Sequence, residues 1–153
     1  MIVDDVLDEN NEKFVVTMSG TPDNVTIGGT RPAHTVTITD NDDPPTIDFT
    51  ATNSAAVEAT TPATMIAQLS GASGLDVTAD YALTGTATGG NADYTLIAGT
   101  VTILAGNTTS TLSATIIDDK VVEVDETIIT TLSNPANSSL GTNKVYTLSL
   151  IHI

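Results

Sequence analysis

The sequence contains no cysteine and no tryptophan, and its four Lys and Arg residues stand against nineteen Asp and Glu. Without cysteine, disulfide bonds, zinc–thiolate sites and thiol nucleophiles are excluded. The formal net charge of −15 repels polyanions, and because no basic stripe opposes it, nucleic acid and anionic membrane surfaces are disfavoured as partners. No apolar run is long enough to span a membrane. A cation is the natural partner of such a chain.

What the chain does have is aliphatic residues at alternating positions. Its 153 residues suffice for one domain of ordinary size with a remainder, and 40% of them are hydrophobic. Leu112, Ala114 and Ile116 alternate with Ser or Thr, and no segment keeps helical periodicity. With Gly, Asn, Pro and Asp at the turns, this pattern predicts an all-β fold. We expect an immunoglobulin-like antiparallel β-sandwich of roughly seven strands over residues 46–153.

An internal repeat divides the chain. The segment from Ile2 to Glu9 recurs from Ile116 to Glu123, so that each residue has its counterpart 114 positions later. Because the first copy lacks its front half, we expect residues 1–43 to be the last three strands of a preceding, incomplete sandwich, and Met1 not to be the natural start. The two prolines at residues 44–45 predict a short, stiff linker. Residues 46–153 are then a nearly complete second copy.

The end of the second copy differs from what the repeat predicts. The first copy ends in Asp-Asn-Asp at residues 40–42, whereas the second has Leu-Ile-His at residues 150–152. Residues 148–153 resemble a translated sequencing adapter, so we expect them to be foreign sequence. The alternative is a divergent last strand.

Fourteen of the nineteen acidic residues lie in three short stretches, residues 4–12, 40–48 and 118–126. Each stretch lies at a predicted strand end, where the loops of a sandwich converge at one pole. Two carboxylates within about 5 Å repel each other by on the order of 3 kcal/mol at an effective dielectric of about 20, which protons or a cation must offset. Calcium, with about six to eight oxygen ligands in loose geometry, suits such loops better than magnesium. The spacing is not that of an EF-hand, and acidic, solvated turns are the alternative.

Several segments of the sequence resemble the Calx-beta domain family. They are Val57-Glu58, the stretch from residue 85 to residue 101 with its Asp93-Tyr94 pair, the Asp-Asp-x3-Glu-x2-Glu signature at residues 118–126 and again at residues 4–12, and the ending at residues 38–42. The resemblance covers essentially all of residues 46–147 and 2–42. It implies an immunoglobulin-like sandwich with calcium sites at one pole and near the junction with the next domain. It also implies a place in the tandem arrays of large bacterial surface proteins.

Carried over residue by residue, the resemblance implies two sets of calcium ligands. In the complete copy they are Glu58, Asp93, Asp118, Asp119 and Glu123; in the half copy they are Asp4, Asp5 and Glu9, joined by Asp40 and Asp42. Both sets are incomplete. The complete copy lacks the terminal acids, and the half copy lacks the strands that would supply counterparts of the first two residues of the other set. We therefore expect weaker calcium binding than in an intact array.

The remaining candidates have plainer interpretations. Tyr94 is expected to pack in the core with its hydroxyl group satisfied. His34 and His152 have no nucleophile arranged beside them, so no Ser-His-Asp or metallohydrolase site is predicted and the protein is not expected to be an enzyme. Residues 40–44 also resemble the cadherin linker, but the other cadherin acid motifs are missing. Four further acids are expected to be solvated or to face solvent at strand starts: Asp8, Glu12, Asp125 and Glu126.

The function predicted from the sequence is a calcium-binding structural or adhesion module of a tandem-repeat protein, in which the ion rigidifies the geometry between domains. The expected location is extracellular or on a bacterial cell surface, in a membrane-associated parent protein. The expected partners are calcium, neighbouring repeats of the same chain, and host or matrix surface molecules. One alternative is an ion-free spacer repeat. The other is an accessory domain of a secreted polysaccharide-active enzyme, which the scarcity of aromatic residues, 3% of the chain, disfavours.

Overall fold

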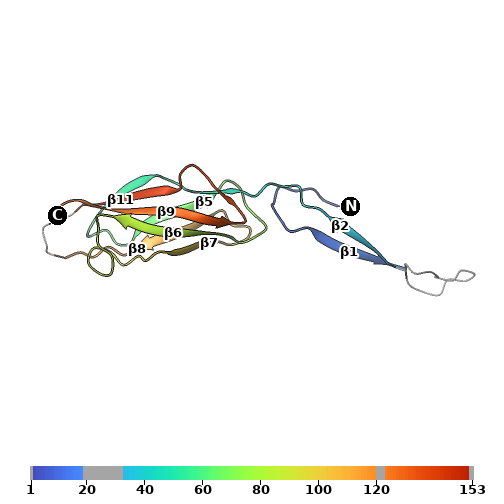
Figure 1. Cartoon of the computed structure of the whole chain (residues 1–153), viewed down its shortest axis with the longest axis horizontal. Helices are drawn as coiled ribbons and strands as arrows, with labels where there is room; N and C mark the ends of the chain where they lie inside the picture. Colours follow the sequence, from blue (N-terminus) through green and yellow to red (C-terminus); the bar gives the residue numbers. More distant parts are fainter. Residues whose placement is uncertain (1, 19–32, 120–122, 152–153) are drawn as a thin grey trace, which may run out of the picture.

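The computed structural model describes residues 2–18, 33–119 and 123–151, and every helix or strand assigned there is a β-strand. Figure 1 shows two parts along the long axis of the molecule, a two-stranded ribbon and a β-sandwich. The ribbon consists of β1 (Glu12–Thr17) and β2 (Ala33–Ile38). The described residues include no helix that is long and apolar enough to cross a membrane.

The sandwich consists of two sheets, and it confirms the predicted all-β, immunoglobulin-like fold class. The four-stranded sheet has the order β10-β3-β5-β8, with β3 at Thr46–Phe49, β5 at Ala63–Leu69, β8 at Thr109–Ala114 and β10 at Ser139–Leu140. The five-stranded sheet has the order β4-β11-β9-β6-β7, with β4 at Asn53–Val57, β6 at Val77–Gly85, β7 at Gly99–Ile103, β9 at Glu126–Ala136 and β11 at Val145–Ile151. Neighbours are antiparallel, except that β10 runs parallel to β3 and β11 parallel to β4.

Residues 46–151 form nine strands in the described part of the chain, rather than roughly seven. The number is larger partly because the chain crosses from one sheet to the other between β3 and β4. Backbone hydrogen bonds hold both ends of the crossing segment. At one end the N–H of Phe49 donates to Asn143 O at 2.9 Å, and at the other the N–H of Thr147 donates to Thr52 O at 2.9 Å. The two-residue strand β10 adds a further member at the edge of β3. Neither feature has a hydrophobic period long enough to be recognised in the sequence.

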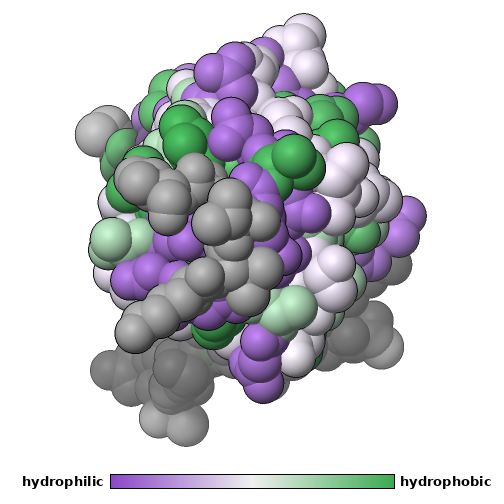
Figure 2. All heavy atoms as spheres, turned by 90° about the vertical axis from the view of Figure 1, so that its left-hand side faces the viewer, coloured by the Kyte–Doolittle hydropathy of each residue, from purple (hydrophilic) through white to green (hydrophobic). Residues whose placement is uncertain are grey.

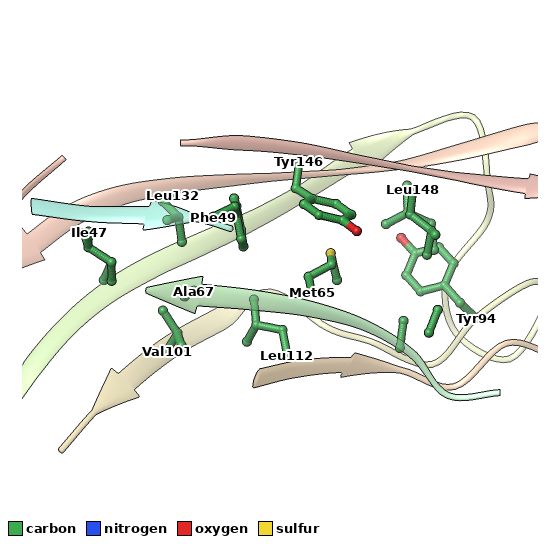
Figure 3. Packing of buried hydrophobic residues seen from close by; sticks show 14 of the residues in the cluster. Ile47, Phe49, Met65, Ala67, Tyr94, Val101, Leu112, Leu132, Tyr146 and Leu148 are labelled. Carbon is green, nitrogen blue, oxygen red and sulfur yellow. The ribbon is translucent and has the colours of Figure 1, made fainter. Parts of the chain in front are cut away.

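The core lies between the sheets, where the alternation predicted it. Strands β5, β7 and β8 bury every second residue, as a pleated strand with one solvated face must. Figure 3 shows Phe49 beside Tyr146, with ring centroids 5.5 Å apart at 63°, the edge-to-face arrangement that aromatic pairs favour. Thr130 is fully buried, and its hydroxyl group donates to Met65 Sδ at 3.2 Å. Burial of this polar group is therefore compensated.

The ribbon pairs the same two segments of the repeat as the β9–β11 pair of the complete copy, but in a different register. Glu12 pairs with Ile38 in the ribbon, and Glu126, the counterpart of Glu12 in the repeat, pairs with Leu150 in the sandwich. Because residues 40–42 align with residues 150–152, the counterpart of Ile38 is Leu148 rather than Leu150. The register of the ribbon therefore differs from that of the β9–β11 pair by two residues. Of the three strands expected over residues 1–43, the described residues contain two, and residues 19–32 lie outside the described part of the chain.

The last described residues belong to the sandwich. Residues 148–151 continue β11, which pairs with β9 on one side and β4 on the other. Leu148 and Leu150 are fully buried. This placement is what the divergent-strand alternative predicts, and the foreign origin of residues 148–153 stays a prediction. Residues 152–153 lie outside the described part of the chain.

Candidate metal centres

The acids of the complete copy gather at the end of the sandwich farthest from the ribbon, which we call the far pole. Strand β4 ends one residue before Glu58, and β9 begins at Glu126. In the sheet, Leu150 of β11 pairs with Glu126 on one side and with Ala56 on the other, so both strand ends stand at the same level. Figure 2 views this pole end-on, where hydrophilic side chains occupy much of the surface between scattered hydrophobic ones.

Asp93 is held at the far pole by the loop between β6 and β7. Its backbone N–H donates to Thr88 O at 3.0 Å, and the Thr88 N–H donates back to Asp93 Oδ2 in a short hydrogen bond. The N–H of Ile117 donates to Asp93 O at 2.9 Å, which ties this loop to the segment that leads into Asp118. Tyr94 forms an isolated bridge with that segment and is buried, as predicted. One Asp93 oxygen is thus fixed by its own loop.

A glycine brings the same loop against the start of β9. Gly85 has a φ of +124°, and a Cβ there would collide with the carbonyl oxygen of Thr127. The N–H groups of Thr86 and Ala87 donate to that carbonyl at 3.0 and 3.1 Å, and the Thr127 N–H donates to Thr86 Oγ1 at 2.9 Å. Only glycine adopts this conformation freely and allows so close an approach. The loop that carries Asp93 is therefore clamped next to Glu126.

Three carboxylates converge at this point. Asp93, Glu123 and Glu126 each contribute one oxygen, and these oxygens all lie within 4.8 Å of one another. Two oxygens that both contact Ca²⁺ at about 2.4 Å can be at most about 4.8 Å apart, so the group fits a single ion without large rearrangement. The donor set consists only of carboxylate oxygens, which suits a hard cation. We call these three residues the far-pole cluster.

The remaining ligands predicted for the complete copy are not members of this cluster. Among the described residues, Glu58, Asp118 and Asp119 contribute no oxygen to this group. Glu58 is 6% exposed, which is unusual for a carboxylic acid. The ligand role of Glu58, Asp118 and Asp119 stays a prediction.

Glu126 is less exposed than the sequence predicted. We expected it to face solvent, but its side chain is partly buried and its carboxylate lies with those of Asp93 and Glu123. The signal for it was present, because Glu126 has a counterpart, Glu12, in the repeated signature. Asp93, however, lies on the loop between β6 and β7, and the spacing of residues in the sequence does not indicate that this loop meets the start of β9.

The predicted ligands of the half copy line one cavity of about 470 Å³ at the junction between ribbon and sandwich. Asp40 Oδ2 accepts a hydrogen bond from the Glu9 N–H at 3.0 Å, and Asp4 Oδ1 accepts one from Asn41 Nδ2 at 3.4 Å. No three acids of this group, all of which the structure describes, have oxygens within 4.8 Å of one another. We call the five acids the junction cluster: Asp4, Asp5, Glu9, Asp40 and Asp42.

Two carboxylates of the junction cluster show the effect of crowding. The pKa of Glu9 is raised above its ordinary value of 4.5, first by partial desolvation and then by Asp5 and the acids around it. The pKa of Asp42 is raised above 3.8, again first by desolvation and then by Asp40 and its neighbours. Both shifts mean that the ionised cluster is unfavourable in the absence of a counter-ion. A bound cation would relieve the same repulsion.

Two acids of the clustered stretches have structural contacts instead. Asp8, which we expected to be solvated, is only 9% exposed and contacts Ser73 of the sandwich. Asp48 Oδ1 accepts the backbone N–H of Asn143 at 2.7 Å, and a Cβ at Gly141 would collide with the Asp48 carboxylate. The sequence gives no sign of either contact, because both partners are distant along the chain.

Comparison with known proteins places these features in a family context. A family model described as the Calx-beta domain matches residues 1–42 and 40–149, in keeping with a tandem repeat. The crystal structure of the apo form of the Calx CBD1 domain superposes with a TM-score of 0.65 at 17% identity, over 72% of this chain and 99% of that one. No curated protein sequence gives a significant match.

Two larger solved structures are similar as well. One is CBD12 from CALX1.2, with a TM-score of 0.63 and 20% identity over 70% of this chain and 44% of that one. The other is described as the calcium binding domain CBD12 of CALX1.1, with a TM-score of 0.63 and 20% identity over 69% and 44%. This chain therefore spans less than half the length of either. At these identities the similarity shows a shared fold.

Proposed function

Because the chain belongs to the Calx-beta domain family, we propose that it is a non-enzymatic, calcium-binding module of a tandem-repeat protein. The observation that carries the proposal is the far-pole cluster, in which three carboxylate oxygens lie within 4.8 Å of one another. A solved structure of similar fold is itself described as a calcium binding domain. The proposed ligands are Asp93, Glu123 and Glu126, and the resemblance implies Glu58 and the pair at residues 118–119 as further ones.

Calcium fits the cluster better than other ions do. The chain has no cysteine, and the cluster has no histidine, so the soft and borderline ligands that favour zinc or copper are missing. Magnesium requires a tighter octahedron and retains several waters, whereas calcium tolerates oxygens supplied by separate loops. Three carboxylates from two segments that are distant along the chain, the β6–β7 loop and the start of β9 with the residues before it, match the second description.

The junction cluster extends the proposal from one domain to the connection between domains. Its acids come from the segment before β1 and from the segment after β2, and it stands beside the linker at residues 44–45. An ion bound there would join segments that repel each other when ionised. We propose that this ion stiffens the junction and fixes the angle between successive repeats, in a protein secreted from or displayed on a bacterial cell, where it would serve a structural or adhesive role.

The described aromatic side chains disfavour the carbohydrate-related alternative. A sugar-binding surface needs several exposed rings, whereas only Phe14 of the five aromatic residues is exposed; Tyr81 is partly buried, and Phe49, Tyr94 and Tyr146 are buried in the core. The ion-free spacer remains the competing function, and calcium binding decides between them.

The test is a thermal melt of the full chain in chelator, in millimolar Ca²⁺, and in Mg²⁺ at the same ionic strength. At a hundredfold excess over Kd, binding stabilises the folded state by about 2.7 kcal/mol. For a domain of this size, that corresponds to a rise in Tm of about 5–10 °C. We expect the rise with Ca²⁺ and a much smaller one with Mg²⁺. An equal Tm in chelator and in Ca²⁺ would leave the ion-free spacer as the function.

A further inference from the structure

The turn between β5 and β6 receives the segment that precedes β1. The N–H of Gly74 donates to the carbonyl oxygen of Asp8 at 3.0 Å, and Ser73 Oγ donates to the same carbonyl at 3.3 Å. Ser73 Oγ also lies 3.5 Å from Asp8 Oδ2, and the two residues form a parallel bridge. We call Ser73 and Gly74 the seat.

The seat is buried and held in place by the sandwich. Ser73 is 1% exposed although it lies at a junction of two parts, and Asp8 is 9% exposed. The N–H of Leu75 donates to Ser73 Oγ at 3.0 Å, and that of Gly106 donates to Ser73 O at 2.8 Å. Because hydrogen bonds from two sides fix Ser73, the sandwich presents two preformed donors, Ser73 Oγ and the Gly74 N–H, to the carbonyl oxygen of Asp8. A polar contact that is buried in this way is costly to break on one side only.

Glu9, the next residue, connects the seat to the junction cluster. Its backbone N–H donates to Asp40 Oδ2 at 3.0 Å, on the side of the cavity. On the other side its side chain lies against Gly74, where an added Cβ would stand 2.6 Å from Glu9 Cγ and 2.8 Å from Oε1. The Glu9 side chain therefore occupies the space that a side chain on residue 74 would take.

From this arrangement we propose that Ser73 and Gly74 are positioning residues for the cation site of the junction cluster. The seat contributes no ligand. It fixes the backbone of Asp8, and the bare Cα of Gly74 lets the Glu9 carboxylate remain at the cavity, so a domain that does not itself hold the ion sets the geometry of one proposed ligand. The inference rests on the proposed calcium function, but the contact itself is measurable without metal.

Gly74→Ala is the decisive variant, and Gly71→Ala is its matched control. Both glycines lie in the same turn and neither has a positive φ, so alanine is tolerated by either backbone. A Cβ at Gly71 meets nothing within 4 Å, whereas a Cβ at Gly74 displaces Glu9. The Glu9 side chain can rotate away, so we expect Gly74→Ala to leave the Tm in chelator close to that of the control. A purely structural role would lower it.

Calcium titration of the full chain, followed by NMR, reports the two clusters separately. The backbone amide of Glu9 reports the junction cluster and that of Asp93 reports the far-pole cluster. We expect Gly74→Ala to weaken binding at the junction by about tenfold or more, as loss of an outer partner of a metal site does, and to leave the far pole unchanged. Ser73→Ala, which removes the hydroxyl group but little volume, should act in the same direction. Equal junction affinities in Gly74→Ala and Gly71→Ala would refute the proposal.

Hydrogen exchange in chelator separates failure of the seat from failure of the proposed function. The Gly74 amide should be protected in the unsubstituted chain, and less protected after Ser73→Ala. If that protection is present but no calcium binds at the junction, the proposed cation site is wrong and with it the positioning role. If the Gly74 amide exchanges as fast as a solvent-exposed one, the seat does not form, and the inference is refuted whatever calcium does at the far pole.

Discussion

Replacing Glu126 by Gln tests its proposed role as a calcium ligand. Because the oxygens of Asp93, Glu123 and Glu126 lie within 4.8 Å of one another, one Ca²⁺ would contact all three. A carboxylate about 2.4 Å from a divalent ion is attracted by about 3.5 kcal/mol at the dielectric of water. Dehydration offsets part of this attraction, and the amide oxygen of Gln remains a neutral ligand. We therefore expect a net loss of about 1.5–3 kcal/mol, or about 10- to 150-fold in affinity.

Asp125→Asn is the matched control for this substitution. Asp125 is the adjacent residue, its side chain is exposed, and its loss changes the net charge by the same amount. It alters the long-range field around the far pole but removes no member of the cluster. Because exposed charges are screened by salt, we expect less than about a threefold change in affinity.

Terbium luminescence offers a suitable assay. The chain has no tryptophan, and Tyr94, next to Asp93, is placed to sensitise a lanthanide bound at the cluster. Added calcium displaces the terbium, and the competition curve gives the calcium affinity of each variant. If Glu126→Gln and Asp125→Asn lower the affinity by the same factor, Glu126 acts only through its charge, and the convergence of three carboxylates does not describe the ion site.

Three further predictions concern the junction, the core and the loop that carries Asp93. The raised pKa values of Glu9 and Asp42 mean that the native state binds more protons than the unfolded one, so in chelator these groups should lower stability as the pH rises above about 4 to 5. Urea denaturation across that pH range, with and without calcium, gives the free energy of unfolding as a function of pH. If calcium leaves this pH dependence unchanged, the prediction is wrong. Phe49→Ala should cost about 3–5 kcal/mol in urea denaturation, because the ring is fully buried; a loss below about 2 kcal/mol would mean that the core is packed differently. Gly85→Ala should lower the Tm far more than Gly106→Ala, since both have positive φ but only the first meets the backbone of β9; similar losses would remove the steric argument.

Much of the fold was accessible from local patterns. Leu112 and Ala114 were assigned to the core from alternation alone, and both are buried. The repeat predicted that the strands beginning at Glu12 and Glu126 hold equivalent places, and each of them pairs antiparallel with the strand that ends its own copy. Such predictions succeed because a strand has a period of two residues, so a few residues suffice to identify its buried face.

The sites were accessible only in part. The sequence identified acidic stretches, but it assigned Asp8 to solvent, whereas that residue is buried against Ser73, 65 positions away. Glu126 was likewise expected in solvent, although the Gly85 turn brings the Asp93 loop beside it. In both cases the partner belongs to another loop, and nothing in the spacing of residues reports which loops meet.

By itself, the sequence determined that this protein is built of β-strands and that it repeats, and it predicted a cation as the partner, because side-chain alternation and net charge are properties of the chain alone. Only the tertiary structure decided which carboxylates stand together and which are buried in structural contacts. Electrostatic repulsion and ion coordination depend on separations of a few ångströms between atoms. Those separations are set by strand register and by turns such as the one at Gly85, where packing rather than sequence distance brings the groups together.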